Sequence, residues 1–467
     1  MIENDTIAAV ASGVGGAVTL IRVSGGEAIA AGDRIFRGVR GRRLADARGF
    51  TILYGTIRDG ETVVDEVLVS VFRAPHSYTG EDMIEVSCHA SAYIQREVMR
   101  LLVESGVRTA QPGEFTLRAF LAGKMDLSQA EAVADMIAAD NRAAHALAYE
   151  QMRGGYSDEF GQLRGRLLEL VSLVELELDF SEEEVEFADR EKLTDLASEI
   201  ERVIKRLSDS FTLGNAIKNG VPTAIIGETN AGKSTLLNRL VKEDKAIVSD
   251  IHGTTRDVIE DTVVLQGITF RFIDTAGIRE THDAIENMGI ERTFQKLDQA
   301  HIVIWLIDAT GSTQDIEKIA GRVLPHCTDK RLIVAFNKVD KIESATQQQL
   351  TDLYKRLTRE KPNTSFIFLS ASHDQNIDIL EKQLTDTVQS TQTGENDIIV
   401  TNARHYEALL NAHDAILRTL NGLQSGLSGD FLAQDIRECM HYLGEITGQI
   451  STDEILGTIF SKFCIGK

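Results

Sequence analysis

The residues from Gly227 to Ser234 read Gly-Glu-Thr-Asn-Ala-Gly-Lys-Ser, which has the spacing of a phosphate-binding loop. The loop follows the apolar run Thr223–Ile226 and leads into a helical pattern that starts at Thr235. Glycines let backbone N–H groups point at phosphates, Lys233 would reach the terminal phosphates, and the Ser234 hydroxyl would bind Mg²⁺. A glycine-rich turn can also be a plain connection. Here, however, strand, complete motif and helix follow one another in the order that phosphate binding requires.

Two later motifs supply further parts of a guanine-nucleotide site. Asp274–Gly277 (Asp-Thr-Ala-Gly) ends an apolar run, which places a carboxylate near Mg²⁺ and a glycine N–H near the γ-phosphate. Asn337–Asp340 (Asn-Lys-Val-Asp) ends another apolar run. The Asp340 carboxylate can accept hydrogen bonds from the ring N–H and the exocyclic amine of guanine, a donor pair that adenine does not offer. The sequence therefore predicts selection of guanine.

Two short loops complete the expected site. Ser370–Ser372 would offer a backbone N–H to the guanine carbonyl, although this tripeptide means nothing without the other motifs. Gly253–Asp257 is a polar loop in which Thr255 can complete the Mg²⁺ shell when GTP is bound. We expect GTP contacts from Asn230, Ala231, Gly232, Lys233, Ser234, Thr235, Thr254, Thr255, Asp274, Thr275, Ala276, Gly277, Asn337, Lys338, Asp340, Ser370, Ala371 and Ser372. The result is a Mg-GTP domain of the α/β class from about residue 217 to 384.

The composition limits what surrounds this domain. A chain of 467 residues, 43% of them hydrophobic, can form two or three packed domains. Its 49 basic and 71 acidic residues give a net charge of −22, which argues against a broad contact with a nucleic-acid backbone. Any RNA would have to be bound locally or through a basic partner. Four widely spaced cysteines, no basic leader and no long apolar run favour the cytoplasm and argue against a membrane span.

The first 118 residues have the pattern of an α+β domain. Residues 6–23 predict two strands joined by a glycine-rich turn, and Arg22 in the second strand either faces solvent or holds an anion. Phe50–Ile57 and Val63–Phe72 predict a hairpin around an Asp-Gly turn. A further strand at 83–88 and a helix at 93–105 complete the expected domain.

Helical spacing dominates on both sides of the nucleotide domain. Ser128 and Glu131 are placed as a capping box ahead of a helix from Ala132 to Ala148. Four longer helices are indicated by these apolar stripes: Phe160, Leu163, Leu167, Leu170 and Val174; Leu193, Leu196, Ile200, Val203 and Leu207; Tyr406, Leu409, His413, Ile416 and Leu420; Leu432, Ile436, Cys439, Leu443, Ile446 and Ile450. We therefore expect one helical bundle built from 119–216 and 385–467, with the nucleotide domain of 217–384 inserted between its halves.

Four stretches outside the nucleotide motifs carry a resemblance to a known family. They are Leu20–Gly25, Ser77–Asp82, Pro112–Thr116 continuing to Gly123–Ala132, and the C-terminal Phe463–Lys467. With these stretches the chain resembles, nearly end to end, the bacterial and organellar tRNA modification GTPases called MnmE or TrmE. One departure is Ser12-Gly13-Val14-Gly15-Gly16, where the family has a proline-containing turn.

The resemblance implies that the N-terminal domain dimerises and binds 5-formyltetrahydrofolate or a related folate. The matching positions are Arg22, Glu81, Lys124 and Lys467. Arg and Lys suit the carboxylates of the folate tail, and a Glu can pair with the amino and ring N–H donors of the pterin. Each residue alone could equally be an ordinary surface charge.

The resemblance also implies partners and a reaction. The family forms a homodimer and assembles with the FAD-containing protein MnmG (GidA) into a heterotetramer. Together they install an aminomethyl or carboxymethylaminomethyl group on the wobble uridine of certain tRNAs. The acidic charge of this chain agrees with a tRNA that is held mainly by the partner.

GTP hydrolysis needs an arrangement other than the one in many small GTPases. Ile278 follows the Asp-Thr-Ala-Gly motif where those proteins place a glutamine, and isoleucine cannot orient water. The resemblance implies instead a K⁺ ion near the phosphates and a catalytic glutamate, which here is Glu286. The positions that match the K⁺ contacts are Asn230, Ser249, Ile251 and Thr254. Of these, Asn230, Ser249 and Thr254 are also expected to contact GTP.

The sequence leaves two interpretations open for Cys464 and two for the function of the whole chain. Cys464 is either a small buried hydrophobe or a nucleophile or proton donor beside the folate, whereas Cys88, Cys327 and Cys439 are expected to be structural. The whole chain is either a GTPase that takes part in tRNA modification or a regulatory GTPase, for example in ribosome assembly or stress response. The C-terminal Cys-Ile-Gly-Lys and the matched N-terminal charges favour the first role.

Overall fold

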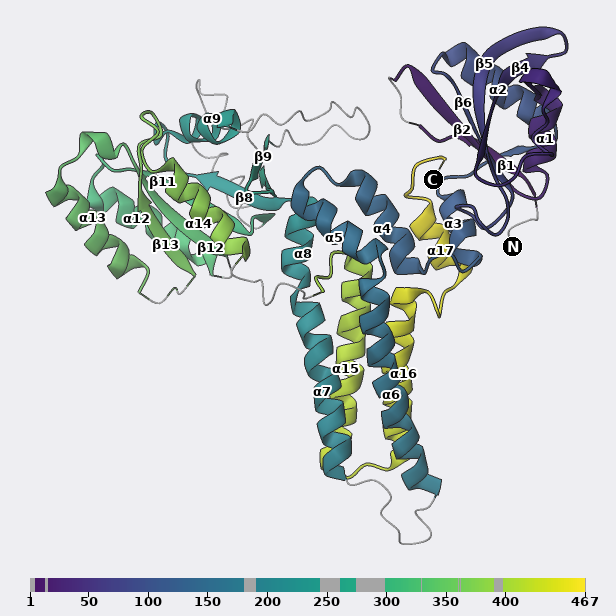
Figure 1. Cartoon of the computed structure of the whole chain (residues 1–467). Helices are drawn as coiled ribbons and strands as arrows, with labels where there is room; N and C mark the ends of the chain where they lie inside the picture. Colours follow the sequence, from purple (N-terminus) through teal and green to yellow (C-terminus); the bar gives the residue numbers. More distant parts are fainter. Residues whose placement is uncertain are drawn as a thin grey trace. The chain divides into compact units, whose positions relative to one another are not determined.

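The computed structural model describes residues 5–12, 16–179, 190–243, 261–273, 299–328, 330–359, 361, 363–389 and 398–466. These residues form two compact units (Figure 1). The first unit is Met1–Ala138, Ala148–Ile200 and Asn411–Lys467, and the second is Ala139–Leu147 and Glu201–Leu410. Among the described residues, none of the helices is long and apolar enough to cross a membrane.

The N-terminal part of the first unit is a mixed sheet with helices packed on it. Its strands are β1 (Ile7–Val10), β2 (Val18–Ser24), β3 (Phe36–Gly38), β4 (Thr51–Asp59), β5 (Thr62–Phe72), β6 (Met83–His89) and β7 (Arg108–Thr109). They lie in the order β3-β4-β5-β6-β2-β1-β7. Neighbours are antiparallel except β1 and β7. The expected strand pair in 6–23 and the hairpin are confirmed.

One face of this sheet is covered by α1 (Ala28–Ile35) and α2 (Ala92–Glu104). Side chains along β5 alternate, so that Val67, Val69 and Val71 are buried in this core while Leu68 is exposed. The period of two is what a sheet with one covered face requires. The sheet therefore has a covered face and an open face.

The helix expected from Ala132 to Ala148 is wrong in both its start and its length. The structure has α4 (Leu127–Ala138) and α5 (Arg142–Met152) in its place. The cap is Asp126, whose Oδ1 accepts the backbone N–H of Gln129 at 2.8 Å while Gln129 Oε1 accepts the N–H of Asp126 at 2.9 Å. This reciprocal pair is a capping box that begins two residues before the one expected at Ser128 and Glu131, because the Asp126 carboxylate is a good acceptor for N–H groups at a helix start.

The helical part of the first unit contains α6 (Gly155–Asp179), α16 (Gly429–Thr447), the start of α7 (Arg190–Asp209) and the end of α15 (Ala403–Ser425), which run side by side (Figure 1). The stripe predicted for α6 is buried throughout, and that of α16 is buried up to Ile446. Of the stripe predicted for α15, Leu409 and Ile416 are buried and the other three residues are partly buried, and the buried face also includes Ala408, Ala412 and Ala415. Counting only large apolar residues overlooked these alanines, which let helices approach closely.

The second unit is a doubly covered α/β fold. Its strands are β8 (Val221–Ile226), β9 (Asp261–Leu265), β10 (Ile268–Phe272), β11 (Ile302–Asp308), β12 (Arg331–Asn337) and β13 (Thr364–Phe368), in the order β13-β12-β11-β8-β10-β9. Only β9 is antiparallel to its neighbour. The near-continuous apolar runs of the parallel strands supply two cores, one on each face of the sheet. The multidomain α/β and α fold class is confirmed.

Helices pack on both faces of this sheet. They are α8 (Phe211–Asn219), α9 (Lys233–Glu243), α12 (Thr313–Val323), α13 (Ser344–Leu357) and α14 (Ile377–Gln389). α9 and α14 pack with α8 on one face, and α12 and α13 pack on the other. Parallel strands place their carboxyl ends at one edge of the sheet, and ligands bind there in open α/β sheets.

Residues 139–147 pack with the nucleotide-domain core, although the sequence placed them in the bundle. Ala143, Ala144 and Leu147 contact this core, and Asn141 Nδ2 donates to Thr269 Oγ1 at 2.9 Å. The predicted boundaries at 118, 216 and 384 fall inside α3 (Glu114–Leu121), α8 and α14. The exact limits of the domains stay a prediction.

Candidate functional site

The phosphate-binding loop lies between β8 and α9. Three residues in it have positive φ angles, Gly227 with 157°, Asn230 with 66° and Gly232 with 98°. A Cβ at Gly232 would lie 2.3 Å from Nδ2 of Asn337, so only glycine fits there. α9 then begins at Lys233 and contains Ser234 and Thr235 in its first turn, where backbone N–H groups are available to an anion. The loop has the geometry that phosphate binding requires.

Lys233 is held against the loop itself. Its Nζ donates to the carbonyl oxygens of Gly227 at 2.7 Å and Glu228 at 2.8 Å. These bonds fold the side chain over the turn, so that its positive charge lies at the loop. A cation in this position suits the terminal phosphates of a nucleotide.

Asn337 joins the phosphate loop to the predicted base loop. Its side chain is buried at the end of β12, where Nδ2 donates to the carbonyl of Ala231 at 2.7 Å. Its Oδ1 accepts the backbone N–H of Ala371 at 3.0 Å. One amide thus ties together three motifs that are spread over more than a hundred residues of the chain. The structure brings together the residues expected at 230–235, 337–340 and 370–372.

Asp340 has the charge state that guanine recognition needs. Its Oδ1 accepts a hydrogen bond from Ser370 Oγ at 2.6 Å, and this bond lowers the pKa of the Asp340 carboxyl. The carboxyl is therefore ionised at neutral pH and can accept two N–H donors from a base. Ser372 lies in the same loop, with its hydroxyl 3.2 Å from that of Ser370.

Asp308 is a polar residue of this site that the sequence reasoning missed. It ends β11, and its Oδ2 accepts a charge-assisted hydrogen bond from Nζ of Lys338 at 2.5 Å. Burial raises the pKa of Asp308, but the bonds from Lys338 and Thr310 outweigh burial and hold the pKa below its usual value. The ion pair fixes Lys338, whose own φ is 64°. A carboxylate that ends a buried apolar run was the signal available in the sequence.

The remaining nucleotide and ion positions lie outside the described residues. They are Ser249, Ile251, Thr254, Thr255, Asp274, Thr275, Ala276, Gly277 and Glu286. The described strands border them in sequence, since β9 begins at Asp261 and β10 ends at Phe272. Their roles stay predictions.

A second cluster gathers the four family-like stretches in the N-terminal domain. Arg22, on β2, donates from Nε to Glu85 at 2.9 Å and from one terminal nitrogen to the carbonyl of Gly466 at 3.4 Å. Its guanidinium carbon lies 5.2 Å from the ring centre of Tyr78 and 5.6 Å from that of Phe115. Of the two interpretations of Arg22, the structure supports an anion partner, which is a carboxylate of the protein itself.

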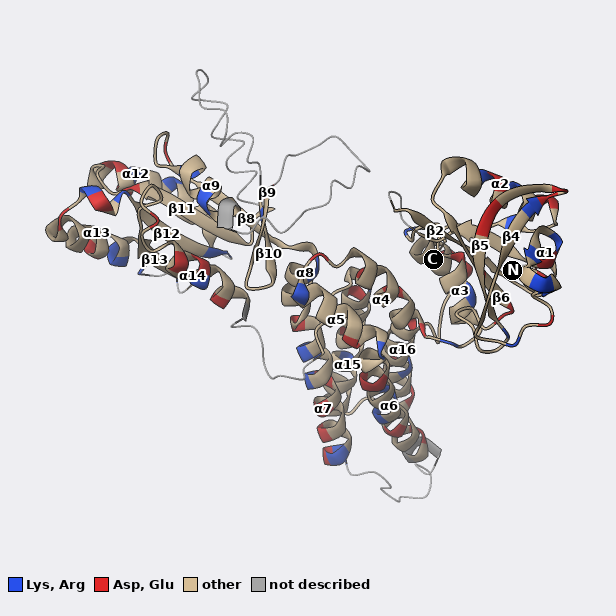
Figure 2. Ribbon diagram, turned by 45° about the horizontal axis from the view of Figure 1, so that its top comes forward, with Lys and Arg blue, Asp and Glu red and all other residues tan. Residues whose placement is uncertain are grey.

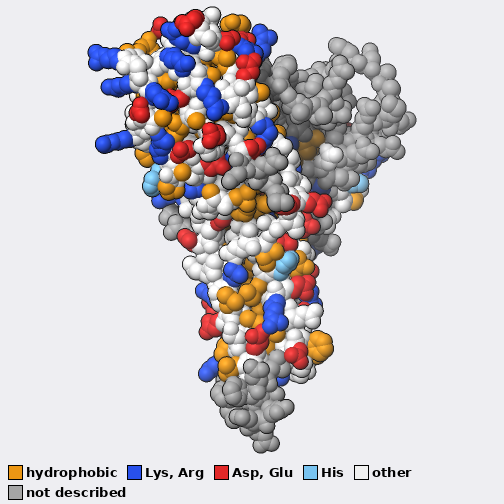
Figure 3. Space-filling model, turned by 90° about the vertical axis from the view of Figure 1, so that its right-hand side faces the viewer, with side chains coloured by type: hydrophobic (Ala, Val, Ile, Leu, Met, Phe, Trp, Pro, Cys, Tyr) orange, Lys and Arg blue, Asp and Glu red, His pale blue; other side chains and the backbone are white. Residues whose placement is uncertain are grey.

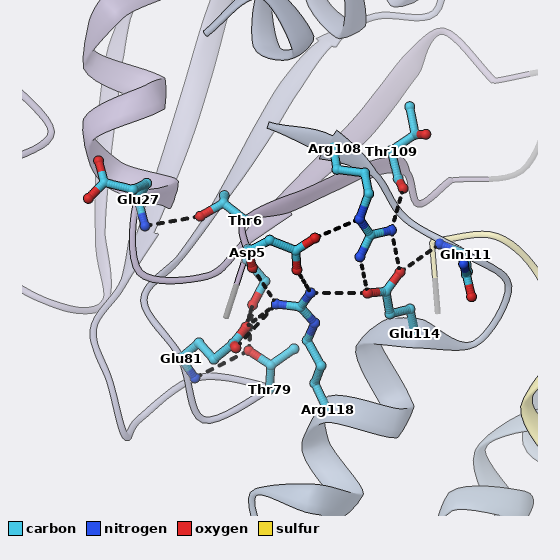
Figure 4. A network of polar contacts seen from close by, with 11 residues as sticks. Asp5, Thr6, Glu27, Thr79, Glu81, Arg108, Thr109, Gln111, Glu114 and Arg118 are labelled. Carbon is cyan, nitrogen blue, oxygen red and sulfur yellow. Dashed lines mark hydrogen bonds and ion pairs between the residues drawn. The ribbon is translucent and has the colours of Figure 1, made fainter. Parts of the chain in front are cut away.

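Glu81 is oriented by a buried arginine that sequence reasoning did not select (Figure 4). Arg118, whose side chain is 3% exposed, donates to both carboxylate oxygens of Glu81 at 3.2 Å. Arg118 also bonds Asp5 at 2.7 Å and Glu114 at 3.0 Å. The hydroxyl of Ser24 donates to Glu81 Oε2 at 2.8 Å. The Glu81 side chain nevertheless remains 31% exposed, so it is fixed in place and still accessible.

Arg108 completes this network from β7. It donates to Asp5 at 2.6 Å and to Glu114 at 2.6 Å, and hydrogen bonds from Arg108 are the largest cause that lowers the pKa of Asp5. Burial raises the pKa of Glu114, but bonds from Arg108, the N–H of Gln111 and Arg118 outweigh it, so this pKa is also lowered. The carboxylates are ionised at neutral pH and balance the two arginines.

The C-terminal tail lies against the same domain. The N–H of Gly113 approaches the carbonyl of Cys464 at 3.4 Å, and a Cβ at Gly466 would lie 2.5 Å from the carbonyl of Val10. Cys464 is exposed, which contradicts the interpretation that it is a buried hydrophobe, whereas Cys88, Cys327 and Cys439 are buried. Lys124 Nζ donates to the carbonyl of Pro75 at 2.9 Å. Lys467 lies outside the described residues.

The chain is similar to known proteins along its whole length. The family model described as the MnmE helical domain matches residues 127–464, and the model described as the GTP-binding protein TrmE N-terminus matches residues 6–124. The tRNA modification GTPase MnmE of Bacteroides thetaiotaomicron is 58% identical over 467 residues, and 100% of each chain is covered. The proteins of the same name from Bacteroides fragilis and Flavobacterium johnsoniae are 56% and 50% identical, again with 100% of each chain covered. Among solved structures, Aquifex aeolicus Era is 26% identical, covering 42% of this chain and 66% of its own, with a TM-score of 0.27 that is too low to support an argument.

Proposed function

This chain belongs to the family of tRNA modification GTPases named MnmE, and we propose that it works with an FAD-containing partner, MnmG, on the wobble uridine of certain tRNAs. In this proposal a folate supplies a one-carbon unit for an aminomethyl or carboxymethylaminomethyl group, and GTP hydrolysis drives the cycle. The observation that carries the proposal is that four separate stretches meet at one cluster around Arg22 and Glu81. A protein that only switched between nucleotide states would not need this cluster.

The residues present in the N-terminal cluster fit a folate. Glu81 is ionisable, fixed by Arg118 and Ser24, and accessible, so it can accept hydrogen bonds from the amino and ring N–H groups of a pterin. Arg22 is already paired with Glu85, and both side chains are less than one-fifth exposed. We therefore assign the folate carboxylates mainly to Lys124 and Lys467. The role of Arg22 is to hold the C-terminal tail of the protein at the site, through its bond to the carbonyl of Gly466.

In the nucleotide domain each described residue has a defined task. N–H groups at the start of α9 and Lys233 would bind phosphates, Ser234 would hold Mg²⁺ together with Thr255, which lies outside the described residues, and Asp340 would select guanine. A K⁺ ion beside the phosphates would supply the positive charge that an arginine finger supplies in other GTPases. For this chain, Asn230 is the described residue proposed to contact that ion, and Glu286 is proposed to orient water.

The open face of the N-terminal sheet supports a homodimer. Ile52 and Tyr54 on β4 and Leu68, directly opposite Tyr54 on β5, are 63%, 51% and 48% exposed. Large apolar side chains on one sheet face favour association when a second copy can cover them. Light scattering should report a dimer for the wild type and a monomer for a variant with Ile52→Ser and Leu68→Ser. A dimer of unchanged stability in that variant would remove this face as the interface.

Binding of 5-formyltetrahydrofolate to the full chain tests the proposed function. Calorimetry should show binding to the wild type and to Glu97→Gln, which changes a partly exposed carboxylate on α2, and a large loss for Glu81→Gln. No binding by the wild type would favour the alternative, a regulatory GTPase. Retained binding by Glu81→Gln would leave a folate site but exclude Glu81 from it. We also propose that the protein is located in the cytoplasm, because its family modifies tRNA.

A further inference from the structure

The charge of this chain is unevenly distributed. Residues 1–124 contain thirteen arginines and one lysine against fifteen acidic residues, although the whole chain has a net charge of −22. Nearly all of the negative charge therefore lies after residue 124. The N-terminal domain is close to neutral and is the part where an anionic partner is least repelled.

Six arginines of this domain lie within fifteen residues and form what we name the arginine edge. They are Arg34, Arg37, Arg40, Arg42, Arg43 and Arg48, and every one of them is exposed. They extend from the end of α1 through β3, the terminal strand of the sheet, into the loop before β4. In the ribbon of Figure 2, blue segments that mark Lys and Arg lie on and near α1, and Figure 3 shows Lys and Arg side chains projecting from one flank of this domain.

Most of this charge is not neutralised by the protein. Asp33 and Asp46 are the carboxylates in residues 33–48. Asp33 accepts backbone N–H groups from Leu44 and Ala45 at 2.6 and 3.0 Å and has only a 3.7 Å contact with Arg43. Arg34 has a long contact of 3.8 Å with the Glu27 carboxylate. Arg37 donates to backbone carbonyls alone. Arg40, Arg42 and Arg48 form no hydrogen bond or ion pair within the described part of the chain. By contrast, Arg100 on the same domain pairs with three carboxylates.

The loop that carries these side chains has a constrained backbone. Arg40 has φ of 61°, a left-handed conformation that is uncommon outside glycine. A Cβ at Gly38 would lie 2.3 Å from the carbonyl of Arg42, so the chain turns back tightly at this point. A constrained loop costs less entropy to order when its side chains bind a partner.

We propose that the arginine edge binds the phosphate backbone of the tRNA, a substrate that this inference takes from the proposed function. Guanidinium groups match phosphate geometry, and unpaired exposed arginines release counterions on binding. An acidic protein surface would be the other anionic partner. However, protein interfaces depend on buried apolar anchors, and Val39 is the one large apolar side chain exposed between residues 34 and 48. The positive charge of the arginine edge would let this chain contact RNA although its net charge is −22.

The position of the arginine edge leaves the folate cluster accessible. β3 and β2 are separated by four strand spacings in the sheet order, which is about 19 Å. RNA held at β3 would not occupy the space beside Arg22. The edge therefore acts as a positioning surface, independent of base sequence.

Fluorescence anisotropy with a labelled tRNA transcript that carries an unmodified wobble uridine tests this inference on the full chain. The variant R40Q/R42Q/R48Q should bind about tenfold more weakly than wild type near 0.1 M KCl. Its plot of log affinity against log salt should be less steep by about two to three units, because each lost phosphate contact removes about one. The matched control is K318Q/R322Q/K355Q, which removes the same charge from exposed positions on α12 and α13 and should bind like wild type.

Three results would overturn the proposal. The variant could keep wild-type affinity and salt dependence, or the control could lose as much, which would indicate only an effect of net charge. The variant could also keep tRNA binding but lose the FAD-containing protein, which would make the edge a protein-docking surface. Folate binding and GTP turnover by R40Q/R42Q/R48Q report separately on its folding and on the proposed function, since no residue of the edge belongs to either site.

Discussion

Replacing Arg118 with alanine should destabilise the N-terminal domain far more than the same change at Arg100. The two arginines are matched, because each forms ion pairs with three carboxylates. They differ in burial, since the Arg118 side chain is 3% exposed and the Arg100 side chain 39%. Buried ion pairs are costly to break from one side, whereas exposed pairs contribute little.

The loss of folding free energy in Arg118→Ala depends on which hydrogen bonds the carboxylate partners of Arg118 retain. Removing one partner of a buried pair costs about 3–5 kcal/mol. Glu114 would retain Arg108 and the N–H of Gln111, and Glu81 can turn to solvent, so the lower limit applies. With an m-value of about 2 kcal/mol per molar urea, a loss of about 3 kcal/mol moves the midpoint of this domain down by about 1.5 M.

The assay must separate the two units, because a single unfolding curve is not defined for a chain of several domains. Trp305 is the only tryptophan of the chain and lies in β11, so its fluorescence reports the nucleotide domain. Hydrogen exchange of peptides from β1, β2 and α3 reports the N-terminal domain. We expect Arg118→Ala to lose protection in those peptides with an unchanged tryptophan transition. Equal effects of Arg118→Ala and Arg100→Ala would refute the reasoning from burial.

Three further changes have defined outcomes. Asn337→Ala should weaken GDP binding by about 1–3 kcal/mol in calorimetry, since it leaves the Ala231 carbonyl and the Ala371 N–H without their partner; unchanged affinity would contradict the clamp. At about pH 8 a thiol reagent should modify only Cys464 in the native protein and four cysteines after unfolding, because burial raises the pKa of Cys88 to about 11 and the other two thiols are also buried; rapid reaction of a second thiol would contradict this. The pKa values of the Asp5 and Glu114 carboxyls are lowered in the folded state. The stability that these two groups contribute is therefore fully present above their ordinary pKa values of 3.8 and 4.5, and it is lost as the pH falls through the lowered values. Exchange-resistant amides of the N-terminal domain should thus become unprotected below about pH 4, and protection that is constant down to pH 2 would be inconsistent with the network.

The sequence could predict which strand ends carry the described nucleotide motifs, the phosphate loop after β8 and the motif that begins at Asn337 at the end of β12. A phosphate loop and a guanine motif are local, and each works through consecutive residues, so type and spacing contain the necessary information. What could not be read was the clamp at Asn337, because its partners Ala231 and Ala371 are joined through backbone atoms that any residue supplies. Motif order predicted the site, and side-chain geometry explains why it holds together.

The N-terminal network shows the opposite case. Asp5, Glu81, Arg108, Glu114 and Arg118 are spread over more than a hundred residues, and each alone is an ordinary charge. No periodicity brings them together; the pairing of β1 with β7 does. The same limit applies to residues 139–147, where a helical pattern predicted neither the break between α4 and α5 nor the core against which α5 packs.

The most direct test of the proposed function is mass spectrometry of tRNA nucleosides from cells that lack this protein. Complementation would use the wild type or Asp340→Asn, which removes the carboxylate proposed to select guanine. The account predicts that the carboxymethylaminomethyl wobble uridine disappears in the deletion strain and returns with wild type only. An unchanged nucleoside profile in the deletion strain, or full restoration by Asp340→Asn, would contradict it.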